Sequence, residues 1–151
     1  MSIEIGINSY MSLDEANEIM EEELLSNDSD LMAWKALSDT DKEKLVIIGT
    51  RLVDKLPFLG IKYNDKIVLQ WPRVMNNKEV ECPRDIKIGL LKQVLRDYYN
   101  KNKQETKLQE LGVKSYSIKN ASISFSDVNS NKLSNGVYKD IYLEYFSKWT
   151  Y

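Results

Sequence analysis

The longest regular pattern of hydrophobic and polar positions runs from residue 83 to residue 101. Apolar side chains recur there at helical spacing and cover more than half of the helix circumference. The members of this arc are Ile86, Ile88, Leu90, Leu91, Val94, Leu95, Tyr98 and Tyr99. A surface helix needs a narrower apolar stripe, so we predict a central helix that lies between several other elements. Pro83 fits its first turn, where the missing N–H costs no hydrogen bond.

A shorter amphipathic helix is predicted near the N-terminus. Ser12 and Glu15 have the spacing of a capping box, in which each side chain satisfies a backbone N–H of the other residue. One narrow apolar stripe follows, and the helix should end near residues 26–28. Residues 30–37 predict a short turn or helix in which Trp34 fills the core.

A second main helix is predicted to begin at Ser38 and to end at Pro57, with acidic residues in its first turn. Its apolar face consists of Leu45, Val46, Ile48, Leu52, Val53 and Leu56. Gly49 lies in the middle of this face, where a glycine costs about 1 kcal/mol relative to alanine. We therefore expect a neighbouring element to approach closely there. Ile47 lies off the face and hints at a further contact.

Residues 58–69 predict a loop with at most a brief strand at 67–69. Trp71, Pro72 and Arg73 form a compact stop, and the residues between this stop and Pro83 are predicted to be a short polar loop.

A β-hairpin is predicted at about residues 113–126, where two segments alternate with period two on either side of residues 119–121. Its apolar positions are Tyr116, Ile118, Ile123 and Phe125. An isolated two-stranded hairpin is marginally stable, so another element or another subunit should cover that face.

Residues 127–136 are rich in Asn and Ser and predict a linker, and residues 137–151 are unusually aromatic. The aromatic residues include Tyr142, Tyr145, Phe146, Trp149 and Tyr151. This segment is interpreted either as a last helix packed on the core or as a terminal arm that docks on a partner through its Tyr and Trp side chains.

These elements indicate a mainly α fold: a small helical bundle of three main helices plus a C-terminal helix or arm, with one projecting β-hairpin. We divide the chain into a helical domain (1–126), a linker (127–136) and the aromatic end (137–151). At 151 residues one domain is expected. No run is long and apolar enough to cross a bilayer, and the N-terminus does not resemble a secretion signal.

Charge is distributed unevenly. The first 34 residues contain nine of the 23 acidic residues and none of the 21 basic ones, so the rest of the chain is net basic. The acidic segment fits a solvated helix face. It also fits subunits that pair an acidic edge with a basic edge around a ring, or a protein with a basic surface near nucleic acid.

The residues offer little for catalysis or for cofactors. The chain has no histidine, which removes the commonest general base and metal ligand. It also lacks the glycine-rich loops that bind phosphates and the Cys/His clusters that bind zinc. Cys82 is predicted to be structural, and consecutive helical positions point Glu21, Glu22 and Glu23 in different directions. We therefore expect no enzymatic activity, no metal and no cofactor.

Nucleic-acid binding is a separate possibility. Residues 84–119 contain nine bases and four acids, with Tyr98, Tyr99 and Tyr116 among them, and a groove for single strands combines cations with stacking rings. However, Tyr98 and Tyr99 also fit the apolar arc of the central helix, and the sequence pI of about 5.3 is low for a nucleic-acid binder. Core tyrosines and solvated lysines are the favoured interpretation.

The order of several short motifs resembles a family of small phage proteins. They are SYMSLDEA at 9–16, WKALSD at 34–39 followed by Lys42 and Glu43, the spaced Arg51, Asp54, Phe58, Gly60 and Lys62, LQWPR at 69–73, Pro83 with its helix, and SISFS at 122–126. The family is that of the head–tail connectors, or head-completion adaptors, of tailed bacteriophages, and some members are described as DnaT-like single-stranded-DNA-binding proteins.

This resemblance implies a structural virion protein. Many copies, usually twelve, would form a ring below the portal protein, bind the next neck or tail-completion protein and extend the channel through which double-stranded DNA passes without sequence-specific binding. The subunit would be assembled in the bacterial host cytoplasm and reside in the virion neck, away from membranes. A heterologous ring needs two unlike lateral faces. A single-stranded-DNA-binding module is the alternative function.

Overall fold

The computed structural model describes residues 2–110 and 132–151, with side chains as far as residue 100 in the first range. Its helices are α1 (Leu13–Glu23), α2 (Ser29–Ala36), α3 (Asp39–Val53) and α4 (Arg84–Glu110), followed near the C-terminus by α6 (Lys139–Ile141), the π-helix η1 (Tyr142–Phe146) and the 3₁₀-helix η2 (Ser147–Trp149). The strands β1 (Ile61–Lys62), β2 (Arg73–Met75) and β3 (Lys78–Val80) form a small antiparallel sheet. The predicted mainly α fold is confirmed.

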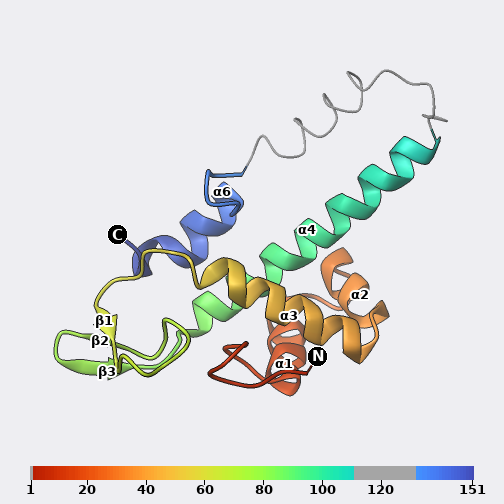
Figure 1. Ribbon diagram of the computed structural model, residues 1–151. Helices are drawn as coiled ribbons and strands as arrows, with labels where there is room; N and C mark the ends of the chain where they lie inside the picture. Colours follow the sequence, from red (N-terminus) through yellow and green to blue (C-terminus); the bar gives the residue numbers. More distant parts are fainter. Residues whose placement is uncertain (1, 111–131) are drawn as a thin grey trace.

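Helix α4 is the centre of the molecule. It contacts α1, α2, α3, α6 and η1, and Figure 1 shows it running between the C-terminal helices on one side and α1 and α2 on the other, with α3 crossing it. Ile86, Leu90, Leu91 and Leu95 on its apolar arc are fully buried, which confirms the predicted central helix. The helix continues to Glu110, nine residues past the end of the pattern at residue 101.

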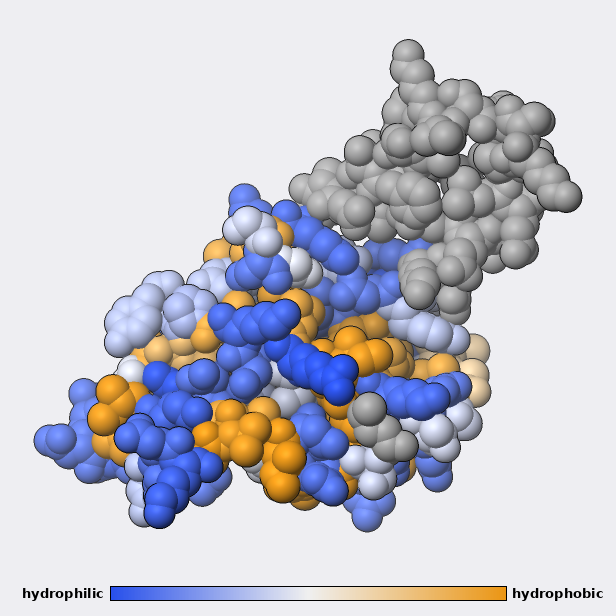
Figure 2. Space-filling model, viewed as in Figure 1, coloured by the Kyte–Doolittle hydropathy of each residue, from blue (hydrophilic) through white to orange (hydrophobic). Residues whose placement is uncertain are grey.

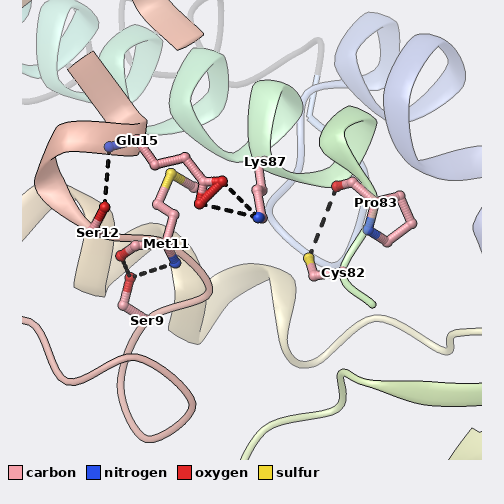
Figure 3. Close-up of polar contacts among 7 residues, drawn as sticks. All are labelled: Ser9, Met11, Ser12, Glu15, Cys82, Pro83 and Lys87. Carbon is pink, nitrogen blue, oxygen red and sulfur yellow. Dashed lines mark hydrogen bonds and ion pairs between the residues drawn. The ribbon is translucent and has the colours of Figure 1, made fainter. Parts of the chain in front are cut away.

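The helix starts follow the sequence closely because caps are local. Ser12 Oγ accepts a hydrogen bond from the Glu15 N–H at 3.1 Å, and Ser38 Oγ accepts one from the Asp41 N–H at 3.2 Å. The Glu15 carboxylate, however, lies 2.8 Å from Lys87 Nζ on α4 instead of closing the predicted capping box (Figure 3). This pair joins the first helix to the central one.

Helix α3 begins after Ser38, as predicted, but ends at Val53 and not at Pro57. Trp34 is buried beside it, as predicted, and a Cβ built on Gly49 would lie 2.5 Å from Leu90 Cδ2, which confirms the expected close approach. The predicted apolar face is confirmed for Val46, Val53 and Leu56, which are buried, and is wrong for Ile48, whose side chain is 53% exposed. Ile47, which hinted at a further contact, is buried. The buried arc turns towards Ile47 because α3 packs against α1 as well as α4.

The stretch before α4 was predicted as a polar loop, and that prediction was wrong. Strands β2 and β3 form a hairpin in which Arg73 pairs with Val80, and its turn residues Asn76 and Asn77 have φ values of 51° and 62°. Two positive φ values in a two-residue turn match the twist of a hairpin, and Asn tolerates them. Residues 58–69 were predicted as a loop with at most a brief strand at 67–69; the strand in this segment is β1 at Ile61–Lys62, which pairs with β2.

The chain ends on the same core. Thr150 forms a β-bridge with Phe58, and the backbone N–H of Leu59 donates to the Trp149 carbonyl at 2.8 Å. Of the predicted linker, residues 132–136 belong to a hydrogen-bonded loop in which the Leu133 N–H donates to the Val137 carbonyl at 2.8 Å. The predicted hairpin at 113–126, with Tyr116, Ile118, Ile123 and Phe125, lies outside the described residues.

Among the helices that the structure describes, none combines the length and the apolar character that crossing a bilayer requires.

Candidate functional site

Arg73 is the centre of a buried polar cluster beneath the sheet. Its Nε donates to the Leu59 carbonyl at 2.7 Å, its Nη2 to the Gly60 carbonyl at 2.8 Å, and its Nη1 to Gln70 Oε1 at 2.7 Å. These acceptors are neutral, and burial lowers the pKa of the guanidinium. The N–H groups of the Arg73 guanidinium therefore hold the 58–60 loop against the sheet.

A second polar cluster joins three distant segments. The Tyr10 hydroxyl donates a short hydrogen bond to Asp54 Oδ1, and the Gln70 N–H donates to the same oxygen at 2.8 Å. Burial, with the adjacent Asp54 carboxylate, raises the pKa of the Tyr10 hydroxyl. The Asp54 carboxylate thus connects the N-terminal loop, the end of α3 and the segment before β2.

Trp71 connects these clusters to the C-terminus. Its buried ring makes edge contacts with Phe58, at a centroid distance of 5.2 Å, and with Trp149, at 6.0 Å. The following Trp71–Pro72 peptide bond is cis. Residues Trp71, Pro72 and Arg73, which were predicted to form a compact stop, therefore lie where the 58–60 loop, the start of β2 and the C-terminal segment pack together.

The aromatic C-terminal segment, for which two interpretations were open, packs on the core of its own chain. Phe146 is fully buried, and a Cβ on Gly89 of α4 would lie 2.7 Å from its ring. Tyr142, Tyr145 and Trp149 are partly buried against the same core. Tyr151 is largely exposed, and among the aromatic residues predicted for partner contact in this segment its ring is the one displayed to solvent.

Gln93, which the hydrophobic pattern did not single out, fastens the C-terminal segment to α4. This fully buried side chain accepts a hydrogen bond from the Tyr138 N–H at 2.9 Å and donates to the Gly136 carbonyl at 3.2 Å. The Tyr138 ring lies between two cations, Arg96 at 4.8 Å and Lys132 at 5.0 Å. A polar residue inside an otherwise apolar helical arc was the available signal for Gln93.

The tyrosines at the far end of the apolar arc of α4 are not core residues, and that interpretation was wrong. Tyr98 is 37% exposed and Tyr99 is 53% exposed. Helix α4 extends past the helices that cover its first half (Figure 1), so the burial implied by the arc ends there. Arg96, two residues before Tyr98 on α4, is paired with Asp140 at 2.7 Å, and Lys132 is paired with Asp97, the residue before Tyr98, at 2.7 Å.

Part of the acidic N-terminal segment is neutralised within the chain. Arg84 lies 2.7 Å from Glu22 and 3.3 Å from Glu23, and Lys35 lies 3.5 Å from Glu21. With the pair between Glu15 and Lys87, these contacts place several of the α1 acids against bases from later in the sequence. Acidic and basic residues are therefore less separated on the folded surface than they are along the sequence.

Cys82 lies just before α4, with its Sγ 3.9 Å from the Pro83 carbonyl (Figure 3). Burial raises its pKa to about 12, so the thiol is protonated at neutral pH. Among the described residues, no group of three or more His, Cys, Asp or Glu side chains could hold a metal ion.

The environment of Cys82 predicts slow alkylation. At pH 8 iodoacetamide should modify the native chain at least about a hundredfold more slowly than the chain in denaturant, because both burial and the raised pKa suppress the reactive thiolate. Mass spectrometry of timed samples measures both rates. Equal rates in the two conditions would contradict a half-buried, protonated thiol.

The comparisons with known proteins give one match. The model of a family described as "Putative DnaT-like ssDNA binding protein" matches residues 2–138, which include the polar clusters, α4 and the Gln93 contact. The comparisons with curated proteins and with solved structures give no match.

Proposed function

Because the chain belongs to the family of putative DnaT-like ssDNA-binding proteins, we propose that it is a DNA-associated structural protein, namely a subunit of the head–tail connector of a tailed bacteriophage. Copies would form a ring, of about twelve if it follows the connector pattern, between the portal protein and the next neck protein. The ring would continue the channel for double-stranded DNA in the virion and would need no enzymatic activity, metal or cofactor.

The observation that carries this proposal is the placement of the residues that resemble the connector family. Tyr10, Asp54 and Arg73 hold neighbouring backbone and side chains through their polar groups, and Trp71 packs its buried ring against Phe58 and Trp149. The indole N–H of Trp71 lacks a partner among the described residues. The residues shared with the connector family thus stabilise the fold, which suits a protein that functions by assembly.

Exposed apolar side chains also support assembly. Ile48, Leu143 and Val68 are each more than half exposed on different elements. Scattered apolar residues are ordinary on a monomer, whereas a subunit of a ring needs such positions on more than one face.

Electron microscopy of purified portal–neck particles from the phage or prophage that encodes this chain tests the proposal. The chain should occupy a ring directly beneath the portal. Neck particles that are complete without it would show that the proposed location is wrong.

The second candidate function is binding of single-stranded DNA. The family description names this function directly, and so it supports this candidate more directly than it supports the connector. The exposure of Tyr98 and Tyr99 favours it too, since stacking rings are one element of a single-strand site.

Replacing Tyr98 and Tyr99 by alanine tests this candidate. If both rings stack on bases, affinity for an oligonucleotide at low salt should fall at least about 30-fold, because each stacked base contributes about 1–3 kcal/mol. Fluorescence anisotropy measures the change. Tyr63→Ala is the matched control, because Tyr63 is also 53% exposed but lies beside the sheet. Equal affinity of all three proteins would dismiss the tyrosine site.

A further inference from the structure

An apolar groove with a volume of about 230 Å³ lies between α3 and α4. Its lining residues are Leu45, Ile48 and Leu52 from α3 and Val94, Asp97 and Tyr98 from α4. Ile48 is 53% exposed and Tyr98 is 37% exposed, so each wall presents a large hydrophobic side chain to solvent. Figure 2, which has the view of Figure 1, shows hydrophobic surface beside hydrophilic surface where α3 crosses α4.

The charged residue of this groove is engaged within the chain. Asp97 Oδ1 lies 2.7 Å from Lys132 Nζ, and Asp97 Oδ2 accepts a hydrogen bond from Gln93 Nε2 at 3.1 Å. The groove therefore offers aliphatic side chains and the ring of Tyr98 to an occupant. A phosphate backbone is bound by cations and polar groups, so it would gain little here. The lining favours an apolar occupant.

The chain re-enters the described structure beside the groove. Lys132, the partner of Asp97, is the first residue of the second described range. The loop that it begins reaches the opposite wall, because a Cβ built on Gly136 would lie 3.5 Å from Leu52 Cδ1. Phe125 precedes Lys132 by seven residues, which can span up to about 23 Å. The apolar residues before Lys132 are thus within reach of the groove.

The other end of the same segment also permits this contact. Helix α4 runs twelve residues past Tyr98 to Glu110, which is about 18 Å. Ile118 follows Glu110 by eight residues, which can span about 26 Å when extended. A strand that begins at the end of α4 can therefore return to the groove.

We propose that the groove holds the apolar side of residues 113–126 of the same chain. The alternation there predicts a hairpin that needs cover, with apolar positions at Tyr116, Ile118, Ile123 and Phe125. A second copy has the same residues, but a segment tethered within reach acts at an effective concentration on the order of millimolar. The chain's own segment is for this reason the favoured occupant. The inference goes beyond both candidate functions and depends on neither.

Disulfide trapping tests this contact in the full chain. In a Cys82→Ser background, Ile48→Cys is combined with Ile123→Cys in one variant and with Phe125→Cys in another. Because a disulfide forms only between Cα atoms closer than about 7 Å, at least one pair should close a bond within the chain in most molecules. Non-reducing electrophoresis separates such bonds from bonds between chains. Tyr63→Cys, at a position that is also 53% exposed, replaces Ile48→Cys as the control and should form few bonds.

Trypsin cleavage after Lys114 and Lys119 gives a measurement that does not depend on which residues face each other. Cleavage should be at least about tenfold faster in Ile48→Glu than in the unchanged chain, because a carboxylate in an apolar contact is costly. Ile61→Glu is the control, since Ile61 is 69% exposed on β1, and it should leave the rate unchanged.

Bonds within the chain together with faster cleavage of Ile48→Glu support the proposal. Bonds mainly between chains would overturn it and assign the groove to a neighbouring copy. Absence of trapped bonds, or equal cleavage rates of Ile48→Glu and Ile61→Glu, would show that residues 113–126 pack elsewhere and would also overturn it. None of these results bears on the place of the chain in neck particles, so the proposed function is tested separately.

Discussion

Removal of residues 137–151 is expected to leave a chain that does not fold. Val137, Ile141 and Phe146 are fully buried in the main core, and Trp149 packs on Trp71. Truncating one large buried side chain costs about 3–5 kcal/mol, and a domain of this kind has only about 5–15 kcal/mol of stability. The loss of several such residues exceeds that reserve. Circular dichroism and a thermal melt should show no cooperative transition for the truncated chain.

Tyr151→Ala is the control for this truncation, because the Tyr151 ring is largely exposed while the backbone that pairs with Pro57 remains. Its melting temperature should match that of the full chain. A truncated chain that melts cooperatively but no longer joins the portal would contradict the structure here. It would restore the interpretation of this segment as a docking arm.

The parts of the fold that local chemistry determines could be predicted from the sequence. Ser12 and Ser38 cap their helices wherever those helices pack, because the bond closes within three residues. The arc of α4 and the close approach at Gly49 were predictable for the same reason: periodicity and the absence of a side chain are visible in one segment. The hairpin at Asn76 and Asn77 also had a local signal, since a pair of Asn residues favours a two-residue turn.

Other features depend on segments far apart and could not be predicted. The buried face of α3 depends on α1 and α4 together. For this reason Ile47 is buried and Ile48 is exposed, although the pattern assigned Ile48 to the apolar face. The exposure of Tyr98 depends on where the neighbouring helices end. Arg73 finds its acceptors in the 58–60 loop, which the sequence places thirteen residues or more away, and Gln93 finds Tyr138 forty-five residues away. A short motif can identify a family without showing what its side chains touch.

The largest single-residue effect is expected at Arg73. In Arg73→Met the carbonyls of Leu59 and Gly60 lose buried donors at 2.7 and 2.8 Å, and Gln70 loses its partner as well. Each buried acceptor left without a donor costs about 1–3 kcal/mol, so unfolding free energy should fall by about 3 kcal/mol or more. A denaturant titration measures it. Arg73→Lys should recover little, because an ammonium cannot reproduce the planar fork of donors.

Arg84→Met provides the matched comparison for this prediction. Arg84 also forms several short contacts, with Glu22 and Glu23, but these lie at the surface, where solvent screens the charges. Its loss should cost less than about 1 kcal/mol. Equal destabilisation by the two substitutions would mean that the Arg73 acceptors find water once the guanidinium is gone. The motif Trp71-Pro72-Arg73 would then depend on Trp71 packing, whereas a large difference assigns its stability to the buried hydrogen bonds of Arg73.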